Sequence, residues 1–431
     1  MLNNVGGVIE TFQEQNRATM IGSVFKYYEN MRIVPDENGI LDVEVSFDGS
    51  WLNRGHRSHI GFGGVIEAFT GFVLDFEILS NICIECKRME TKKKKQNLDE
   101  AAYESLKKKH EPNCRCNFVG LSGAMEKEGA VRLWKRSEAK NKMRYMVFIG
   151  DGDSSAFDAV TRLNDNAGPY TAKIRKEECI NHVAKRLGTR LRKLKNETVE
   201  VKETKSGKSY KRSLLSGKHK LTDAVIDKLS WYFGLAVRRC KGQTTEILRN
   251  DKMAAFDHCS STDKIPNHAR CPKGEGTWCF YQEALYKKET PPSHKKMIVY
   301  FNLEEREKEK VLEVYQSLTT DELLGRCLAG KTQNPNEALH SKIWKTLSKT
   351  KFFGLKTVQF SATHNILQHN FGYAEGSILP HLGFGGPSNP ARHNLKRKDI
   401  AREKTAATPK GPRSKRMKKD QPSSEYGAGK F

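Results

Sequence analysis

The stretch YMVFIGDGDSSAF (residues 145–157) decides the fold expected of this chain. It begins with an apolar run that has the length and composition of a buried strand. The run ends at Asp151, and Asp153 follows two residues later. Carboxylates just past the C-terminal end of a buried strand lie where α/β sheets usually place their chemistry. The stretch therefore predicts an α/β fold with an acidic site at one edge of its sheet.

A basic helix is expected in EECINHVAKRLGTRLRKLK (residues 177–195). Its apolar residues recur at helical spacing, and most of its basic residues lie off that stripe. Cys179 and His182 are three residues apart, so both lie on one face of the first turn. Taken singly, these features also fit a turn, a buried cysteine and a solvated basic face. Their order along the chain favours a functional interpretation.

Three strands are expected before this region. The segment DVEVSFDGSW (42–51) alternates apolar and polar residues, which indicates a half-buried strand with Asp48 near its end. The segments 60–69 and 71–79 predict two more strands joined by a tight turn. A helix near Ser122 to Lys140 precedes the apolar strand. This order of elements is that of a ribonuclease H-like α/β core, although order alone says little about function.

Composition and pattern divide the chain into a lead-in, a core in two parts, an insertion and a tail. The expected segments are a lead-in at 1–40, a first core part at 41–176 with a zinc-knuckle insertion at 83–116, a mainly helical zinc-bearing insertion at 177–330, a second core part at 331–382 and a disordered basic tail at 383–431.

The net charge of +24 is spread over the whole chain. Residues 391–431 hold 13 Lys and Arg against 4 Asp and Glu, so the tail supplies +9 and the body +15. A basic tail alone could be a localisation signal, and ATPKGPRSKRMKKDQ (407–421) is typical of a nuclear import signal. A basic body as well favours a polyanionic partner, most simply DNA. The alternative to a polyanionic partner is a generic basic protein, and the alternative to an import signal is a solvated, disordered tail.

The ten cysteines are expected in a reducing compartment. The N-terminal residues lack the pattern of a secretory signal peptide. No apolar run approaches the ~20 residues that span a bilayer, so no membrane partner is expected. In a reducing compartment, clustered Cys and His indicate metal sites more than disulfides.

Two segments predict structural zinc sites. In the first, two cysteines spaced as a metal-binding knuckle are followed by a second pair of ligands, with Cys116 competing for either late position. In the second, a segment rich in Pro and Gly offers four ligands and one spare, Cys259. The favoured ligands are Cys83, Cys86, His110 and Cys114 for the first site and His258, His268, Cys271 and Cys279 for the second. The alternative for the first segment is a set of free thiols. The alternative for the second is a loop whose His and Cys residues are incidental.

The candidate catalytic residues are acidic. Asp48 and Asp151 each end an expected strand, and Glu337 opens a late helix after NPN. Carboxylates brought together in this way could hold two Mg²⁺ or Mn²⁺ ions ~4 Å apart, and hard oxygen ligands suit these ions. Each acid alone also fits a surface residue or a helix cap, and a first-turn glutamate such as Glu337 also complements the helix dipole.

At this point the chain resembles Mutator-like transposase domains, which are cut-and-paste DNA transposases. The resemblance covers roughly residues 40–375, and its motifs are specific only when taken jointly. They are VSFDGSWLNRGH (45–56), the Cys83/Cys86 knuckle, NFVGLSGAME (117–126), YMVFIGDGDSSAF (145–157), ECINHVAKRL (178–187), the ST…H..CP.G..WC segment (261–279) and NPNEALHSKIW (334–344).

The resemblance implies a ribonuclease H-like core with a helical insertion. It also implies that Asp48, Asp151 and Glu337 are the catalytic acids. Asp153 and the Cys-x-x-His pair, Cys179 and His182, would support the active site. The implied reactions are hydrolysis at element ends and joining of the freed 3′ end to target DNA. The helix residues Lys185, Arg186, Arg190 and Arg192 would hold the DNA backbone.

Other functions fit parts of the same pattern. Transposases often act as dimers or larger assemblies, so a second copy of the chain is among the expected partners. The main alternative is a zinc-stabilised nuclear DNA-binding protein, derived from a transposase, that no longer catalyses. A different ribonuclease H-like nuclease would explain the acids but not the two Cys/His clusters.

Overall fold

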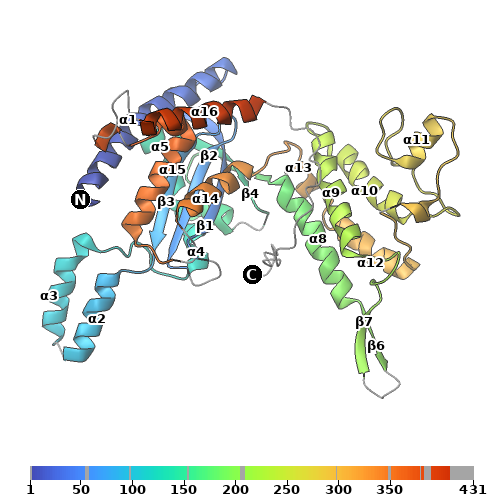
Figure 1. Ribbon diagram of the computed structural model, residues 1–431, viewed down its shortest axis with the longest axis horizontal. Coiled ribbons are helices and arrows are strands. Elements are labelled where there is room, and N and C mark those ends of the chain that lie inside the picture. The colour runs from blue at the N-terminus through green and yellow to red at the C-terminus, as the bar shows by residue number, and fades with distance from the viewer. Residues whose placement is uncertain are drawn as a thin grey trace. The chain divides into compact units, whose positions relative to one another are not determined.

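The computed structural model describes residues 2–53, 58–96, 99–152, 155–203, 209–297, 299–347, 351–378, 380–382 and 390–407. The chain forms two compact units, whose elements Figure 1 labels. The first unit contains the described parts of residues 1–176 and 333–418, and the second contains those of 177–332. Asp153 and residues 408–421 of the expected import signal lie outside the described residues.

A five-stranded mixed sheet organises the first unit, with strand order β3-β2-β1-β4-β5. The hairpins β1–β2 and β2–β3 are antiparallel, whereas β1 and β4 run parallel. Gly71 has φ +74° in the tight turn before β3, which suits a residue without a Cβ. The strands are β1 (Leu41–Trp51), β2 (Ile60–Glu67), β3 (Val73–Ser80), β4 (Met143–Gly150) and β5 (Arg175–Glu178).

Helices cover both faces of this sheet. On one face the Trp134 ring of α4 packs on Phe47 of β1 and Phe148 of β4, with ring centroids 5.8 and 5.0 Å apart. On the other face Leu339 and Ile343 of α14 join the apolar side chains of β2 and β3. The helices of this unit are α1 (Leu2–Asn30), α2 (Ile84–Gln96), α3 (Glu100–His110), η1 (Glu111–Asn113), α4 (Ser122–Lys135), α5 (Ser137–Asn141), α6 (Ser155–Thr161), α7 (Leu163–Asn166), α14 (Asn334–Thr346), α15 (Leu355–Glu375), η3 (Pro380–Leu382) and α16 (Pro390–Ala407).

Helix α16 lies inside the segment that composition assigned to a disordered tail. It packs against α15. The Asp399 carboxylate accepts the backbone N–H groups of Tyr373 at 2.6 Å and Ala374 at 2.8 Å, beside Gly372, whose φ of +90° interrupts α15. Such a tertiary cap depends on a partner 26 residues away, so local composition does not reveal it.

The second unit is mainly helical. Its core packs apolar side chains of α8, α9 and α12, including Leu187, Phe233 and Tyr315. Thr222 and Thr244 accept a backbone N–H at the first turns of α9 and α10, which satisfies donors that a helix start leaves open. Its elements are α8 (Ile180–Glu197), β6 (Val199–Glu203), β7 (Ser209–Ser213), α9 (Asp223–Arg239), α10 (Thr245–Ser260), α11 (Phe280–Tyr286), η2 (His294–Lys296), α12 (Glu305–Gln316) and α13 (Asp321–Gly325).

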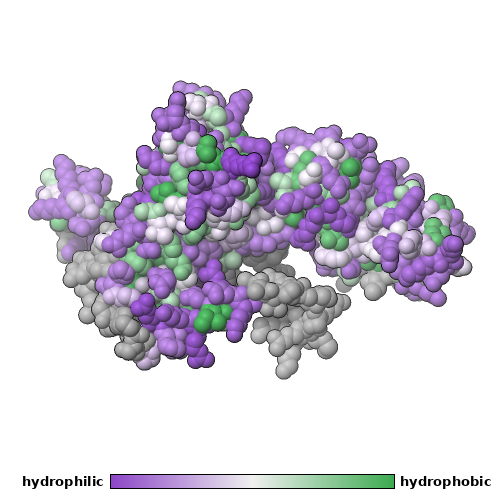
Figure 2. Space-filling view, turned by 90° about the horizontal axis from the view of Figure 1, so that it is seen from above, coloured by the Kyte–Doolittle hydropathy of each residue, from purple (hydrophilic) through white to green (hydrophobic). Residues whose placement is uncertain are grey.

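The surface is largely polar. In Figure 2 hydrophilic residues dominate the visible face, and apolar residues are scattered among them. Among the described residues, none of the helices has the length and hydropathy that crossing a bilayer requires. The fold is therefore a mixed α/β structure with one five-stranded mixed sheet and many helices.

Candidate functional site

Two aspartates extend from neighbouring strands at the same edge of the sheet. In the parallel pair, Ser46 of β1 lies opposite Ile149 of β4. Asp48 and Asp151 each follow two residues later, and adjacent strands lie ≈ 4.7–4.9 Å apart. Their backbones therefore lie side by side at the C-terminal end of the parallel pair. Asp48 is half-buried and Asp151 is exposed.

Helix α14 lies along β1 and brings a polar stripe to Asp48. The Gln333 Nε2 atom donates to the Phe47 carbonyl at 2.7 Å, and the buried Asn336 amide donates to the Gly64 carbonyl at 3.1 Å. Further along the helix, Trp344 Nε1 donates to the Ser50 hydroxyl at 2.7 Å. These contacts fix the rotation of α14 about its axis.

The same stripe positions His340 and the predicted acid Glu337. The His340 Nδ1 atom lies 3.6 Å from the Asp48 carboxylate. Glu337 lies one turn earlier, in the first turn of α14, with its side chain exposed. Residues three apart on a helix are neighbours on its surface. The turn that carries Glu337 is therefore held against the strand that carries Asp48.

Glu126 of α4 is an acid at this edge that the sequence analysis did not assign to the site. Its side chain lies against Gly49, where an added Cβ would approach Glu126 Cγ to 2.6 Å. Burial raises the pKa of the Glu126 carboxyl, and the charge of Asp151 raises it further. The N-terminus of α4 is tied to β1, because Trp51 Nε1 donates to the Ser122 carbonyl at 2.9 Å.

The remaining residues predicted to support the site or hold DNA lie in the second unit, on or beside α8. Cys179 is buried and precedes the first turn of α8, which contains His182. Arg186 binds the fully buried carboxylate of Glu178, so it has a structural partner. Arg190 donates to the Ser317 hydroxyl at 2.7 Å, Arg192 pairs with Asp227, and Lys185 is exposed.

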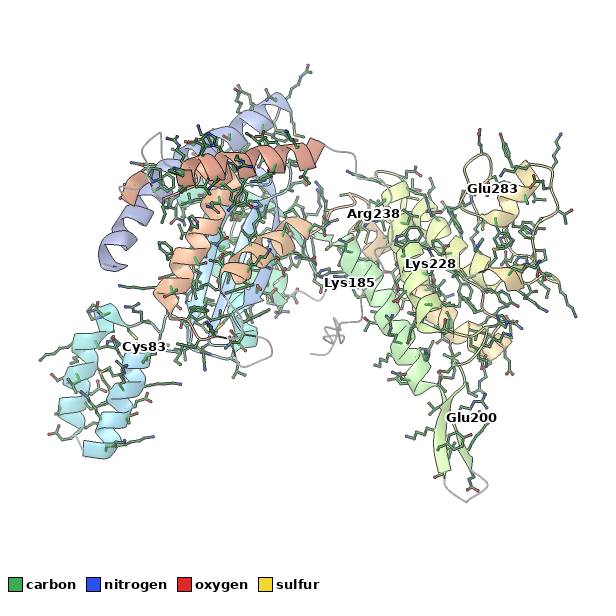
Figure 3. The ribbon with its side chains drawn as sticks, in the orientation of Figure 1. Cys83, Lys185, Glu200, Lys228, Arg238 and Glu283 are labelled. Carbon is green, nitrogen blue, oxygen red and sulfur yellow. The ribbon has the colours of Figure 1, made fainter. Side chains whose placement is uncertain are left out.

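The first predicted zinc set comes together at the base of the α2–α3 hairpin, where Figure 3 labels Cys83. Ligand atoms of Cys83, Cys86, His110 and Cys114 all lie within 4.8 Å of one another. Cys83 Sγ is 3.2 Å from His110 Nε2, and Cys86 Sγ is 3.5 Å from Cys114 Sγ. The fifth candidate, Cys116, donates instead to the Phe118 carbonyl at 3.4 Å.

The surroundings of Cys83 lower the pKa of its thiol and so favour the thiolate form. Burial alone would raise the pKa of this thiol, but the backbone N–H groups of Arg115 and Cys86 and the His110 ring lower it to about 6. The thiolate is the form that binds metal. A Cys₃His donor set at this spacing could therefore hold zinc.

The second predicted set is fully buried. Ligand atoms of its four members also lie within 4.8 Å of one another, and the members are His258, His268, Cys271 and Cys279. The Nδ1 atom of His268 faces both thiols of the set, at 3.6 Å from Cys271 and 3.4 Å from Cys279. The Cys271 thiol and the two histidines lower the pKa of Cys279. This Cys₂His₂ set could hold a second zinc ion.

His294, which the sequence analysis did not identify, lies next to the ligand candidate His268. The Nε2 atom of His268 lies 2.9 Å from Nε2 of His294, which is buried. The Nδ1 atom of His294 lies 2.7 Å from the Asp263 carboxylate, whose pKa is lowered first by the Ser293 hydroxyl and then by His294. Histidine ligands of metals commonly donate their second ring N–H to such partners.

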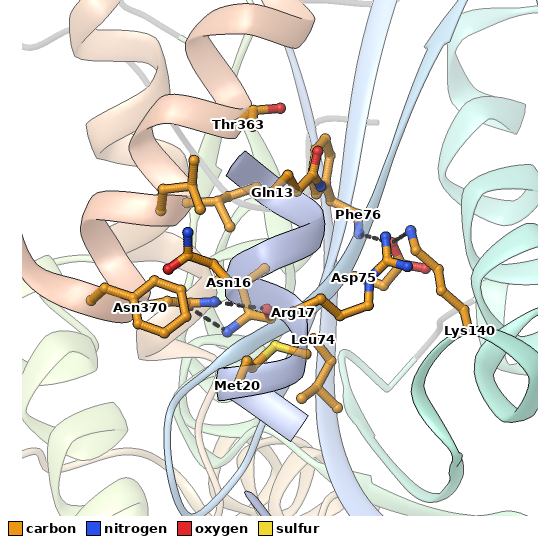
Figure 4. A pocket seen from close by; sticks show the side chains of 14 residues that line it. Gln13, Asn16, Arg17, Met20, Leu74, Asp75, Phe76, Lys140, Thr363 and Asn370 are labelled. Atoms are coloured by element: carbon orange, nitrogen blue, oxygen red, sulfur yellow. Dashed lines mark hydrogen bonds and ion pairs between the residues drawn. The ribbon is translucent and has the colours of Figure 1, made fainter. Parts of the chain in front are cut away.

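A surface pocket between α1, α15 and β3 belongs to none of these clusters (Figure 4). Its carboxylate, Asp75, is bound by Arg136 at 2.7 Å and Lys140 at 2.6 Å. Its amide, Asn370, bonds both backbone groups of Val73. The Asp75 and Asn370 side chains therefore join elements of the fold, and we assign no ligand to the pocket.

Comparison with known proteins gives one match. Residues 3–279, more than half of the chain, match the family model described as Mutator-like transposase. This range includes Asp48, Asp151 and both Cys/His sets, whereas Glu337 and α14 lie beyond it. No curated protein and no solved structure matches the chain. The extent of the match shows that the chain belongs to the Mutator-like transposase family.

Proposed function

We propose that this protein is a DNA transposase, or a protein derived from one, that cleaves and joins DNA with Asp48, Asp151 and Glu337. The family implies DNA binding and a transposase-derived function. The observation that carries the catalytic proposal is the position of α14, which holds the turn of Glu337 against β1 beside Asp48. In this proposal the mixed sheet and its flanking helices form a ribonuclease H-like core.

The acids would hold two Mg²⁺ or Mn²⁺ ions, which activate the attacking oxygen and stabilise the leaving oxygen of a phosphodiester. The carboxylate oxygens of Asp48, Asp151 and Glu337 fit these hard ions. His340 would orient the Asp48 carboxylate, and Gln333 would anchor the helix start. Glu126 would add negative charge next to Asp151.

Two phosphoryl transfers follow from this site. In the first, water attacks a phosphodiester at the element end, the P–O3′ bond breaks, and a 3′-hydroxyl is released. In the second, this hydroxyl attacks a phosphodiester of target DNA and loses its proton, a new P–O3′ bond forms to the element end, the target's own P–O3′ bond breaks, and the departing oxygen takes up a proton as the 3′-hydroxyl of the displaced target strand. One set of carboxylates can serve both steps because the reacting groups are the same.

The test is a cleavage assay with the purified chain, duplex DNA and Mg²⁺ or Mn²⁺. We expect Asp48→Asn, Asp151→Asn and Glu337→Gln each to abolish cleavage while DNA binding persists. The matched control is Glu37→Gln, which removes an exposed carboxylate. Equal activity in Asp48→Asn and Glu37→Gln would remove the proposal. A wild-type chain that binds DNA and never cleaves it would instead be a zinc-stabilised DNA-binding protein that has lost catalysis.

The proposed location is the nucleus, where the DNA substrate is found. Its support is the basic segment 407–421 in the sequence. Fusing this segment to a fluorescent protein and observing the fusion in cells tests the location. We expect nuclear accumulation, and an even distribution between nucleus and cytoplasm would contradict it.

A further inference from the structure

The α2–α3 hairpin is held in place without a core of its own. None of the residues whose burial is described in α2 (84–95) or α3 (100–110) is buried. The two helices pack on each other, and Figure 1 shows them projecting beyond the sheet of the first unit. A helix that is polar all round needs a stabilising influence other than core packing.

A metal ion held by the first Cys/His set would supply this influence at the base of the hairpin. Cys83 and Cys86 lie at the start of α2, whereas His110 and Cys114 lie at and just after the end of α3. A metal ion bound by all four residues would join the two ends of the hairpin and fix its direction. The helices beyond the metal would then form a stiff arm roughly 17 Å long, from the ~1.5 Å rise of each helical residue.

The hairpin carries more positive charge than its own acids neutralise. Residues 84–110 contain nine Lys and Arg and five Asp and Glu. Within the hairpin, Lys93 pairs with Glu100 and Lys107 with Glu104. Seven further basic residues pair with no carboxylate among the described residues, and these are Lys87, Arg88, Lys92, Lys94, Lys95, Lys108 and Lys109.

The arrangement of these charges suits an elongated polyanion. Arg88, Lys92 and Lys95 are spaced by four and three residues, so they form one stripe along α2. In the antiparallel hairpin, Lys108 and Lys109 at the end of α3 extend the charge to the base. Duplex DNA presents one phosphate per ≈ 3.4 Å of each strand, so an arm of this length faces several phosphates at once.

We propose that the α2–α3 hairpin is a zinc-braced arm that grips the phosphate backbone of duplex DNA. The inference rests on the proposed function, because it assumes that DNA is the substrate. The arm would contribute a part of the DNA affinity that does not depend on base sequence, since lysines that contact phosphates do not read the bases. The metal sets the direction of the arm, so loss of the metal site weakens DNA binding even though no ligand touches DNA.

The test measures binding of the full chain to a labelled duplex over a range of salt concentrations. The hairpin variant is Lys92→Ala/Lys94→Ala/Lys95→Ala. We expect about a tenfold or greater loss of affinity near 0.1 M salt, and a salt slope that is shallower by about one for each phosphate contact removed. The control is Lys26→Ala/Lys135→Ala/Lys218→Ala, which removes the same charge from exposed lysines elsewhere and should have a smaller effect.

A second variant, Cys86→Ser, tests the metal brace. We expect it to retain less zinc and to lose a similar share of DNA affinity. Combining it with the three lysine substitutions should add little, because both changes disable the same arm. If the wild-type chain binds no DNA, the proposed function and this inference fail together. If it binds DNA and the hairpin variant has the same DNA affinity and salt slope as the control, only the proposed role of the arm is contradicted.

Discussion

The Nδ1 atom of His340 lies 3.6 Å from the Asp48 carboxylate, and this contact links helix α14 to β1, which lies almost 300 residues earlier in the chain. His340 is buried and packs edge-on against Phe62 of β2, with ring centroids 5.5 Å apart. The ring therefore has little freedom to turn away. It can orient the carboxylate that we expect to bind metal.

Replacing His340 with Ala should lower the rate of metal-dependent DNA cleavage by about 10–100-fold, a typical cost of removing a residue that orients a metal ligand. Asp48→Asn should cost more, because it alters the ligand itself. His340→Gln keeps a polar group near Asp48 and should restore part of the rate. The measurements are cleavage rates over a range of Mg²⁺ concentrations, with thermal melting to establish folding. A normal rate in a folded His340→Ala protein would contradict the role.

Replacing Glu126 with Gln should stabilise the first unit at neutral pH. The folded-state pKa of Glu126 is raised by burial and by Asp151. The Glu126 carboxyl therefore binds its proton more tightly in the folded chain than in the unfolded chain. As the pH rises above the ordinary pKa of glutamate, the free energy of unfolding consequently falls. The Gln variant lacks this loss. Its gain in unfolding free energy should appear at pH 7 in denaturant titrations and vanish below the ordinary glutamate pKa.

The matched control for this comparison is Glu128→Gln, two residues further along α4, where the carboxylate pairs with Arg132 at 2.8 Å. It should not stabilise the protein, since it removes a favourable pair. Equal responses of the two variants at pH 7 would show that Glu126 is not held in an unfavourable environment.

The sequence predicted those parts of the site that depend on local signals. The apolar run before Asp151 and the alternation before Asp48 are short-range patterns, and both correspond to strands, β4 and β1. The two Cys/His sets also followed from spacing, because soft ligands that recur within a few residues have few other uses in a reducing compartment. The structure brings the members of each set together.

The sequence did not indicate those site residues whose role depends on partners far away in the chain. In the sequence Glu126 is an acid near the start of an expected helix, where it needs no functional explanation, and only the fold places it against Gly49. His294 lies beyond the dense Cys/His segment, so its contact with His268 has no signal in the spacing.

Replacing His294 with Ala should weaken zinc binding at the second set by about 10–100-fold. When His268 binds metal through Nδ1, its Nε2–H can donate to His294, which in turn donates to Asp263. Removing His294 leaves the ligand ring free to rotate. Competition against a chromophoric chelator measures the affinity, and the visible spectrum of the Co²⁺-loaded protein reports the ligand geometry directly.

Asp263→Asn should have a smaller effect in the same direction, because it keeps an acceptor beside His294. The control is His59→Ala, an exposed histidine of the first unit. A His294→Ala protein whose zinc affinity and Co²⁺ spectrum match those of the control would show that His294 only fills space.

Replacing Lys252 with Met should stabilise the second unit and remove a pH dependence. Lys252 is fully buried, its Nζ lies 3.9 Å from the Phe233 ring centroid, and it has no hydrogen-bond partner among the described residues. Burial lowers the pKa of this ammonium to about 8. The unfolded chain then binds more protons between pH 8 and the ordinary lysine pKa of about 10.4, so stability of the native protein should rise with pH across that window.

The size of this rise is of the order of 3 kcal/mol, from ~1.4 kcal/mol for each pKa unit. Cysteine thiols of the unfolded chain have an ordinary pKa of about 8.5 and titrate near the same window, so the informative quantity is the difference in unfolding free energy between Lys252→Met and the wild type at each pH. That difference should be largest at pH 8 and below, and should shrink as pH approaches 10.5. Lys218→Met, which changes an exposed lysine, should show no such trend. A difference that is independent of pH would mean that the Lys252 ammonium is solvated in the folded protein.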